Sequence, residues 1–431
     1  MSSCLRRRVG IRTISRLRQA LTPKMPRDHI TQEVIDMLRE IYSGSLSQIE
    51  KDYKFSEFQY DTITDAELNA KPQVLVIGQY SVGKTTFVRY LLGEDFPCMV
   101  IGPEPTTDKF TAVMHGRESQ AVHGHSVAAI KDLPFEGVAQ LGAEFLSHFE
   151  LSLAPAELLR SLTLVDTPGM LAGAEERVRR GYDLPSAVRW FADRSDLVLV
   201  MFDSHKFDLS REMRETLIAL RGREAKLRFL LNKADQPAPQ ELIRCYGHLM
   251  RRLSGLVDAI ESKYVYVGSF WDRRKDTWEV FENDEEKLVT ELYQLPRSST
   301  VRKINDFIVR IKRLKTHIRI LSYLKSCMPK YFFHEAAQFY ITTQLPHIFE
   351  KIKSHYELTD SDMPDITEFR KVLHLLHLED IPVASRKTLR RLDAIIDQKF
   401  PLIFQKVNAI TSAFELKSVP RELRSSHSGR W

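Results

Sequence analysis

The sequence predicts an α/β domain, with a mostly parallel sheet between flanking helices, joined to regions that are entirely helical. Between residues 71 and 295, short apolar segments that suit buried strands alternate with charged segments that suit helices, which is the pattern of a parallel sheet. After Pro296 no strand-like segment remains, and apolar residues recur at helical spacing. A phosphate-loop motif follows the first predicted strand.

Composition and charge exclude several classes of protein. A chain of 431 residues that is 43% hydrophobic and 28% charged is globular and too long for one ordinary core. Its net charge is +6, but residues 1–27 contain eight basic and no acidic side chains, which leaves 55 basic and 57 acidic residues in the body. No nucleic-acid partner is expected for a body so close to neutral. No apolar run approaches the roughly 20 residues of a membrane-spanning helix, so membrane contact is expected to be peripheral.

Residues 1–27 form a basic N-terminal tail for which three interpretations stay open. Arginines alternate there with apolar residues, as in a transit peptide or in a segment that lies on anionic lipid. The third interpretation is a disordered start. Mitochondrial targeting by this tail therefore stays open.

The order of the elements follows from the spacing of apolar residues. An amphipathic helix is predicted over 30–42, within an N-terminal helical segment at 28–70. Strands are predicted at 73–77, 162–165, 197–202, 227–231 and 264–267, with helices between them at 85–92, 208–222 and 240–254. Later helices are predicted at 304–324, 334–355, 366–378 and 386–408, before a flexible tail at 417–431.

The segment from residue 73 to residue 92 carries the strongest chemical signal. Residues 78–85 match the pattern GxxxxGK[ST] between a strand and a helix, which is the context that this motif needs. Backbone N–H groups of such a loop surround phosphates, its lysine neutralises the β- and γ-oxygens, and its hydroxyl ligates Mg²⁺. The predicted nucleotide-binding residues here are Gly78, Gln79, Tyr80, Ser81, Val82, Gly83, Lys84, Thr85 and Thr86.

Two further segments complete the predicted phosphate and metal site. Asp166 follows a strand and begins the sequence Asp-Thr-Pro-Gly, so its carboxylate is expected at the sheet edge, in the shell of Mg²⁺. The N–H group of Gly169 is expected to sense the γ-phosphate. Thr107 lies in the sequence Pro-Thr-Thr-Asp and is expected to close on the metal. The predicted metal site is therefore Thr85, Thr107 and Asp166.

A base-binding motif of the G-protein type follows the strand at 227–231. Its residues are Asn232, Lys233 and Asp235. The carboxylate of Asp235 can accept two hydrogen bonds from a purine edge. Because guanine offers two donors there and adenine offers fewer, this chemistry alone predicts GTP.

The amino-acid sequences of the motifs, and their order along the chain, resemble those of one family. The chain closely resembles the EHD (EH-domain-containing) family of dynamin-related membrane-remodelling ATPases in the segments GQYSVGKTTFVRYLLGEDFP, IGPEPTTDKFTAVMHG, LVDTPGMLAG, RGYDLPSAVRWFADRSDLVLVMFDSHK, LNKADQ and VYVGSFWD. The resemblance covers about residues 28–415. It implies a dynamin-type P-loop G domain at 71–295 and an α-helical domain assembled from 28–70 and 296–416.

The resemblance also implies an activity and partners. EHD proteins prefer ATP despite their NKxD motif, so ATP with Mg²⁺ is expected, with GTP as the alternative, and Trp271 is expected beside the base. Further implications are lipid-stimulated hydrolysis, dimers and ring-like oligomers on curved membranes, and a role in endocytic recycling or vesicle trafficking at endosomal or plasma membranes, on the cytoplasmic side. Trp190 and Phe191 are candidates for the dimer interface. Because the chain stops at Trp431, neither an EH domain nor its peptide partners are expected.

The predicted membrane tip follows the long helix at 304–324. Phe332 matches an inserted phenylalanine of the family, whose lysine cluster is replaced here by Ala337, Gln338 and Phe339. Aromatic residues crowd this segment, which suits a bilayer interface but would also suit a helical core. Phe332 and Phe333 are the predicted membrane residues.

The predicted mechanism assigns catalysis to positioning and charge neutralisation by Lys84, Thr107 and Gly169. Met170 follows this glycine and cannot orient water by hydrogen bonding, so slow basal turnover is expected, with faster turnover when lipid-driven assembly orders the loops. Two alternatives stay open. One is a GTP-binding switch or scaffold with incidental turnover, and the other is a soluble translation-type GTPase that prefers GTP and RNA.

Overall fold

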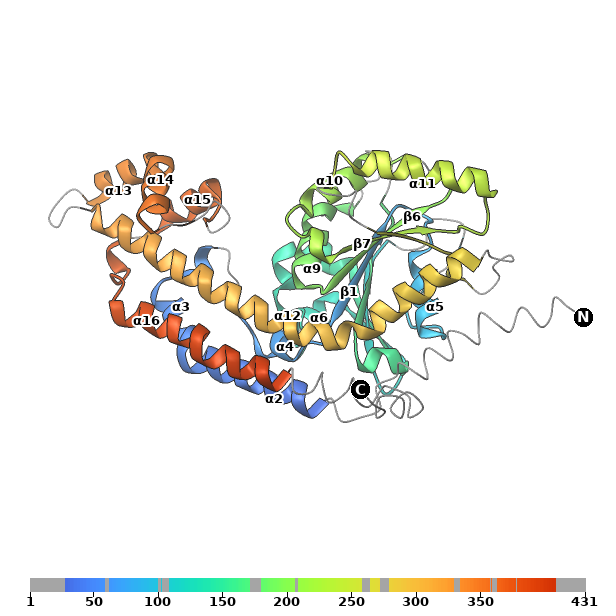
Figure 1. Ribbon diagram of the computed structural model, residues 1–431, viewed down its shortest axis with the longest axis horizontal. Coiled ribbons are helices and arrows are strands. Elements are labelled where there is room, and N and C mark those ends of the chain that lie inside the picture. Colours follow the sequence, from blue (N-terminus) through green and yellow to red (C-terminus); the bar gives the residue numbers. More distant parts are fainter. Residues whose placement is uncertain are drawn as a thin grey trace, which may run out of the picture. The chain divides into compact units, whose positions relative to one another are not determined.

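The computed structural model describes most of the chain, and the described residues form two compact units. One unit, the α/β unit, runs from Asn69 to Ser299, and the other, the helical unit, combines Met25–Leu68 with the chain from Thr300 onward (Figure 1). The predicted fold class, an α/β domain plus a helical domain built from both of its flanks, is confirmed. The described residues are 28–58, 62–99, 102, 108–170, 180–205, 208–257, 264–271, 279–328, 334–356, 358, 363–376 and 378–407.

An eight-stranded sheet forms the centre of the α/β unit. Its order is β3-β4-β2-β5-β1-β6-β7-β8, and neighbours are parallel except for β3 with β4 and β2 with β5. Val76 of β1 pairs with Asp166 of β5, and Gly78 pairs with Met201 of β6, so the carboxyl ends of these three strands meet at one edge. The bounds are β1 Gln73–Gly78, β2 Phe110–His115, β3 Gln120–His123, β4 Phe149–Ala154, β5 Thr163–Asp166, β6 Leu197–Asp203, β7 Leu227–Asn232 and β8 Val265–Val267.

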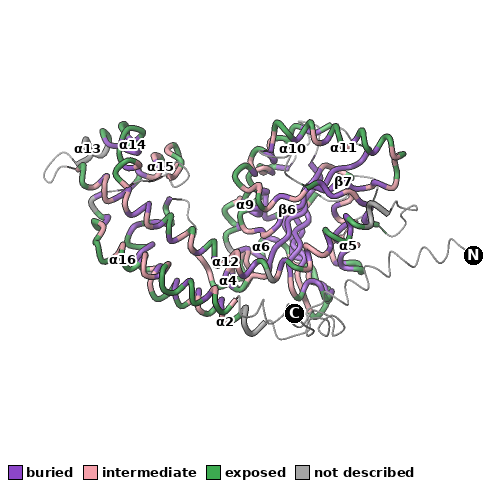
Figure 2. Tube along the Cα trace, viewed as in Figure 1, coloured by how far each residue is buried: buried purple, intermediate pink, exposed green. Residues whose placement is uncertain are grey.

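Helices cover both faces of this sheet. Val198 and Val200 of β6 join a core with α9, α10 and α11, whereas Leu197 and Leu199 join a second core with α5 and the first part of α12. Because both faces are covered, the central strands are buried throughout and read as continuous apolar runs (Figure 2). The helices are α5 Lys84–Leu92, α6 Gly124–Ala129, α7 Ala143–Ser147, α9 Leu184–Arg194, α10 Arg211–Ala219 and α11 Pro239–Leu253, with short 3-10 turns η3 Glu136–Leu141, η4 Glu157–Arg160 and η5 Glu224–Lys226.

Three strands, β2, β3 and β4, were not predicted from the apolar pattern. In β4 the buried polar residues Glu150 and Ser152 interrupt the apolar run. Glu150 is satisfied because it accepts a hydrogen bond from the Thr111 hydroxyl of β2 at 3.1 Å. β3 is one of the two edge strands and is largely exposed. A search for continuous apolar runs does not detect strands that bury polar pairs or lie exposed at a sheet edge. This explains why these three strands were not predicted.

The predicted boundary at residue 296 falls inside a helix. α12 spans Glu279–Ser326 without interruption, and Pro296 lies within it. An internal proline removes one backbone hydrogen bond and strains the preceding turn. Leu292 and Leu295 are nevertheless buried in one core before the proline, and Ile304 is buried in another after it. Burial on both sides therefore outweighs the cost of the proline.

The helical unit joins the segment before the sheet to the segment after it. Leu38, Ile311, Phe369 and Leu392 contribute to one core. Figure 1 shows α2 beside the last helical segment, where Lys406 pairs with Glu33. The elements are α2 Asp28–Ile41, the π-helical η1 Tyr42–Leu46, α3 Ser47–Asp52, η2 Phe55–Phe58, α4 Asp65–Asn69, the later part of α12, α13 His334–Thr343, α14 Leu345–Tyr356, α15 Ile366–Leu375, η8 Leu378–Asp380, α16 Arg386–Ala394 and η9 Ile395–Lys399.

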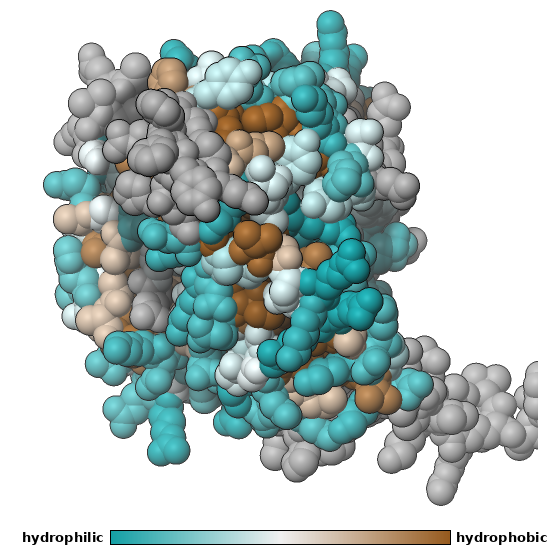
Figure 3. Space-filling view, turned by 90° about the vertical axis from the view of Figure 1, so that its left-hand side faces the viewer, coloured by the Kyte–Doolittle hydropathy of each residue, from teal (hydrophilic) through white to brown (hydrophobic). Residues whose placement is uncertain are grey.

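Apolar side chains reach the surface of the helical unit. Phe339 and Tyr340 of α13 and Leu375 of α15 are exposed. Figure 3 faces the end of the unit that carries these helices and shows apolar atoms between hydrophilic ones. Within the described part of the chain, no helix has both the length and the apolar character needed to cross a bilayer.

Candidate functional site

The phosphate loop connects β1 to α5 and is held tightly by its surroundings. At Gly78 a Cβ atom would lie 2.6 Å from the Met201 carbonyl oxygen, and at Gly83 it would lie 2.8 Å from the Asn232 side-chain nitrogen. Gly83 also has a φ of +91°, which favours glycine. Both glycines of the motif are therefore required for close approach of the backbone to neighbouring strands.

The lysine of the loop already lies across its backbone. Lys84 is buried, and its Nζ donates to the carbonyl oxygens of Gly78 and Gln79, each at 3.2 Å. An ammonium group held at this point places a positive charge inside the loop, where phosphate oxygens bind in proteins of this kind. Gln79 in turn donates through its side chain to the Asp208 carbonyl oxygen at 3.0 Å.

Thr85 and Asp166 form a pair of hard oxygen donors at the strand ends. The Thr85 hydroxyl donates to Asp166 Oδ2 at 2.5 Å, while Asp166 Oδ1 is buried without a hydrogen-bond partner. Burial raises the pKa of Asp166 to about 6, although the nearby Lys84 ammonium and the bond from Thr85 act in the opposite direction. An unsatisfied buried carboxylate oxygen beside a hydroxyl fits a site for Mg²⁺, which prefers oxygen ligands.

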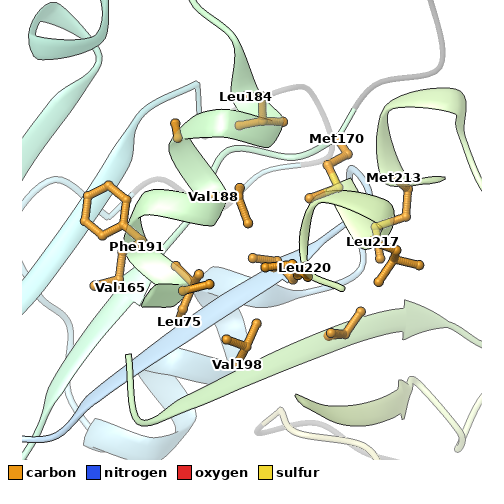
Figure 4. Packing of buried hydrophobic residues seen from close by; sticks show 14 of the residues in the cluster. Leu75, Val165, Met170, Leu184, Val188, Phe191, Val198, Met213, Leu217 and Leu220 are labelled. Atoms are coloured by element: carbon orange, nitrogen blue, oxygen red, sulfur yellow. The ribbon is translucent and has the colours of Figure 1, made fainter. Parts of the chain in front are cut away.

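Gly169 lies directly against the phosphate loop. A Cβ atom at Gly169 would lie 2.8 Å from Tyr80 Cα. The backbone N–H of Tyr80 donates to the Met170 carbonyl at 3.1 Å, and the N–H of Met170 donates to the Gly78 carbonyl at 3.2 Å. The Met170 side chain points away into the core near Met213 of α10 (Figure 4). The glycine is thus placed beside the loop, and the methionine side chain is not.

A buried ion pair that sequence reasoning missed holds this glycine from the other side. Arg180 donates through Nη2 to the Gly169 carbonyl at 2.5 Å and through Nη1 to Glu212 Oε1 at 2.8 Å. Both charged side chains are buried, so each depends on the other for compensation. The sequence RGYD contains this arginine, but nothing in its local pattern indicates that it reaches Gly169.

The base-binding motif is bonded to the same loop. Asn232 donates through its side chain to the Val82 carbonyl at 2.8 Å, and Lys233 Nζ donates to the Ser81 carbonyl at 2.6 Å. Lys233 also pairs with Asp203 at the end of β6, at 2.7 Å. Asp203 is a second residue that the motif search missed, because its position opposite Asn232 depends on the pairing of β6 with β7.

Asp235 is already bonded within the chain through both carboxylate oxygens. The Ser269 hydroxyl donates to Oδ1 at 2.7 Å, and the Trp271 indole N–H donates to Oδ2 at 3.2 Å. The backbone N–H of Asp235 donates back to the Ser269 hydroxyl oxygen at 2.9 Å. Trp271 is about one third exposed, so its ring borders the surface where a base would lie. Ser269 was not predicted, although it lies in the quoted sequence GSFW.

Three of the predicted site residues lie outside the described residues. Thr107 lies outside the described residues, as do Phe332 and Phe333 at the predicted tip. Thr86 lies in the first turn of α5 and is half-buried. The structure brings the other predicted nucleotide and metal residues together at one edge of the sheet. These are Gly78, Gln79, Tyr80, Ser81, Val82, Gly83, Lys84, Thr85, Asp166, Gly169, Asn232, Lys233, Asp235 and Trp271.

One expectation about the dimer interface is wrong. Phe191 is fully buried in the core of the α/β unit, where its ring stacks on Phe110. Trp190 is also buried and lies under the Arg194 guanidinium, 3.9 Å from the ring centroid. Both aromatic side chains pack within the single chain, so they are not available as an exposed interface.

The fold and the site define a P-loop nucleotide-binding protein with a G-type domain. Three family models match the chain. The model of the dynamin family matches residues 74–234, and that of the N-terminal part of EH-domain-containing proteins matches residues 37–69. The model of a domain of unknown function matches residues 298–404. EH domain-containing protein 2 of Mus musculus is 39% identical over 86% of this chain and 69% of its own length, and EH domain-containing protein 1 of Homo sapiens is 39% identical over 85% and 68%. The chain belongs to the EH domain-containing protein family.

Among solved structures, an oligomerised bacterial dynamin pair is 15% identical with a TM-score of 0.37 and covers 92% of this chain and 73% of its own. These matches confirm the expected family and, in general terms, the expected function. The protein is a nucleotide-binding member of the dynamin family that remodels membranes, associates with them peripherally and belongs among nucleotide hydrolases.

Proposed function

We propose that this protein is a Mg²⁺-dependent ATPase that oligomerises on curved membranes and whose slow hydrolysis is stimulated by that assembly. Endocytic recycling or vesicle trafficking is the proposed process, and GTP is the alternative nucleotide. The proposed preference for ATP rests on one observation: both carboxylate oxygens of Asp235 already accept hydrogen bonds from side chains of this chain. The alternative of a translation-type GTPase is not favoured, because the curated relatives are EH domain-containing proteins.

The preference for ATP rests on competition for one carboxylate. Guanine recognition gains most when both oxygens of the motif aspartate are free to accept from N1–H and the exocyclic amine. Here Ser269 and Trp271 already donate to those oxygens. A guanine must therefore share or displace these donors, which reduces its advantage over adenine.

The proposed roles of the phosphate-side residues follow from their chemistry. Thr85 and Asp166 would hold Mg²⁺ together with Thr107, and the bound ion would neutralise charge on the phosphate oxygens. Lys84 supplies a fixed positive charge to the same phosphates. Gly169 offers a backbone N–H to the γ-phosphate, at a position that Arg180 supports through the carbonyl.

Slow basal hydrolysis is proposed because the residue that directly follows Gly169 is Met170, whose side chain is unsuited to orienting water. The Met170 side chain is buried in the core and has no N–H or O–H group that could hold a water molecule. Assembly on lipid would then accelerate hydrolysis by acting on the segments around 100–110 and 168–180. If nucleotide turnover is unaffected by lipid, the protein is instead a switch or scaffold in which hydrolysis is incidental.

Calorimetric titration of the full chain with ATP and with GTP, each with and without Mg²⁺, tests the proposed nucleotide. We expect tighter binding of ATP than of GTP, and weaker binding of both without Mg²⁺. Lys84→Ala is the control, because loss of the central cation should abolish binding of both nucleotides. Tighter binding of GTP would overturn the proposed preference.

A further inference from the structure

The N-terminal part of α12 belongs to the α/β unit and shares a core with Phe270, which directly precedes Trp271. Leu288, Val289 and Leu292 are buried in the same core as Phe270 and Phe87. Tyr266 of β8 belongs to the same core. Acidic residues one turn earlier on α12 therefore face the end of β8 and the loop that follows it.

Two buried carboxylates of α12 bind the backbone, one at the last residue of β8 and one in the loop that follows it. Asp284 Oδ2 accepts from the Val267 N–H at 3.2 Å, and Glu285 Oε1 accepts from the Ser269 N–H at 3.1 Å. The fit is close, because a Cβ atom at Gly268 would lie 3.1 Å from Glu285 Cγ. A charged acceptor makes a stronger bond to a backbone N–H than a neutral one does.

The residue that Glu285 binds is the one that pairs with Asp235. Ser269 is completely buried, and its hydroxyl both donates to Asp235 Oδ1 and accepts from the Asp235 N–H. The next N–H along the loop, that of Phe270, donates to Asn232 Oδ1 at 3.3 Å. Asn232 in turn binds the Val82 carbonyl of the phosphate loop. One line of hydrogen bonds thus runs from α12 through the base-binding motif to the phosphate loop.

We propose that Glu285 is a positioning residue for the base: its carboxylate fixes Ser269, and Ser269 in turn keeps the Asp235 carboxylate engaged so that adenine is favoured over guanine. The inference rests on the proposed function, because it requires the base to lie beside Asp235 and Trp271. Glu285 itself acts through Ser269. Loss of its carboxylate should loosen the loop, weaken base binding and free Asp235 for guanine.

The test compares three changes at one position in the full chain. Glu285→Gln keeps an oxygen acceptor at the same reach, Glu285→Ala removes it, and Glu285→Asp keeps the charge but withdraws it by one methylene. Calorimetry measures binding of ATP, GTP and inorganic triphosphate, which has no base. Loss of a hydrogen bond to a charged group predicts about tenfold weaker ATP binding in the Ala and Asp variants, a smaller ratio of ATP to GTP affinity, and unchanged triphosphate binding.

The matched control is Glu291→Ala. Glu291 is also an acidic residue of α12, but it bonds to the Arg228 guanidinium and to the Tyr266 hydroxyl and not to the loop. Glu291→Ala should leave the ATP to GTP ratio unchanged. Glu285→Gln keeps the acceptor but not the charge, so it should lose less ATP affinity and less of the ratio than Glu285→Ala. Far-UV circular dichroism checks that each variant is folded. If the Ala variant does not fold, the Asp variant provides the test.

The outcomes separate this inference from the proposed function. If the wild type binds ATP, GTP and triphosphate equally, the base makes no contact and the proposed function fails together with the inference. If the wild type favours ATP and the Ala and Asp variants keep both its affinity and its ratio, the inference alone is overturned. Equal weakening of triphosphate binding would also overturn it, since the effect would then not concern the base.

Discussion

At the scale of single residues, buried polar side chains decide which conformations the two units hold. Asp166 and Lys84 in the α/β unit, and Glu50 and His317 in the helical unit, are all buried. Each has a specific partner, because a buried polar group without one is costly. Where one atom has no partner, as at Asp166 Oδ1, the position is a ligand site candidate.

His317 makes the stability of the helical unit depend on pH. Its ring is packed among aromatic side chains, with centroids 4.7 Å from Phe58 and 5.2 Å from Phe55, and Nε2–H donates to the Tyr53 carbonyl at 3.0 Å. Burial lowers the pKa of His317 to about 4, and the bond to Tyr53 opposes this only in part. The folded state therefore favours the neutral ring.

We expect wild-type stability to fall between pH 6.5 and pH 4, because protons bind the unfolded chain more readily than the folded one in this range. The contribution is present above the ordinary pKa of histidine and is lost as the pH approaches the folded value, about 3 kcal/mol in all. His317→Gln retains a donor to Tyr53 but does not titrate. Urea unfolding of both proteins at several pH values measures the difference, and parallel curves would contradict the prediction.

At the scale of elements, α12 is the helix that both units share. Its first part contributes to the core of the α/β unit and its later part to the core of the helical unit. The later part also binds the segment before the sheet. Arg310 donates to Glu50 of α3 through Nε at 2.6 Å and through Nη2 at 2.8 Å, and the Tyr42 hydroxyl donates to the same carboxylate at 3.0 Å.

This buried pair predicts how strongly the two halves of the helical unit depend on each other. Glu50→Ala leaves the Arg310 side chain, which is only 16% exposed, without its carboxylate, and this should destabilise the unit by about 3 kcal/mol. Glu33→Ala is the control, because the exposed pair of Glu33 with Lys406 should contribute less than about 1 kcal/mol. Denaturant unfolding compares the two variants.

A second variant tests whether the cost lies in the unpaired charge. Combining Glu50→Leu with Arg310→Met removes both charges and should recover much of the stability lost in Glu50→Ala. Two results together would show that the pair does not join the two segments. The double variant would recover no stability, and Glu50→Ala would lose no more stability than Glu33→Ala.

At the scale of the whole molecule, we predict that nucleotide binding and membrane binding belong to different units. The nucleotide residues gather at one edge of the sheet in the α/β unit, and exposed aromatic residues such as Phe339 and Tyr340 lie in the helical unit. The predicted tip residues Phe332 and Phe333 lie outside the described residues, so their role stays a prediction.

Replacing both tip phenylalanines should separate membrane binding from nucleotide binding. Phe332→Ala with Phe333→Ala is expected to lower the lipid-bound fraction about tenfold, because each aromatic ring removed from the interface costs apolar burial. Lipid stimulation of phosphate release should fall with it, while ATP affinity stays unchanged. Liposome co-sedimentation, phosphate release and calorimetry measure the three quantities.

Leu402→Ala is the matched control for the tip, because Leu402 is an exposed apolar residue of the helical unit outside the aromatic segment. It should leave co-sedimentation unchanged. Unchanged sedimentation of the double phenylalanine variant would remove these residues from membrane binding.

Much of this architecture is predictable because it depends on local patterns. Five neighbouring strands, β5, β1, β6, β7 and β8, are predicted from apolar runs, since strands with covered faces carry continuous apolar residues, and the phosphate loop is predicted from its short motif. β2, β3 and β4 were missed because their burial depends on polar pairs such as Thr111 with Glu150 or on an edge position. The helix through Pro296 was missed because local propensity opposes it and packing on both sides favours it.

The sequence alone determined the α/β class, the phosphate and base motifs and the family, because these are encoded in short runs of neighbouring residues. Only the tertiary structure decided what those motifs touch: Arg180 at Gly169, Asp203 at Lys233, and Ser269 between Glu285 and Asp235. Such contacts join residues far apart in the chain, and their distances depend on strand order and helix packing. No local pattern specifies them.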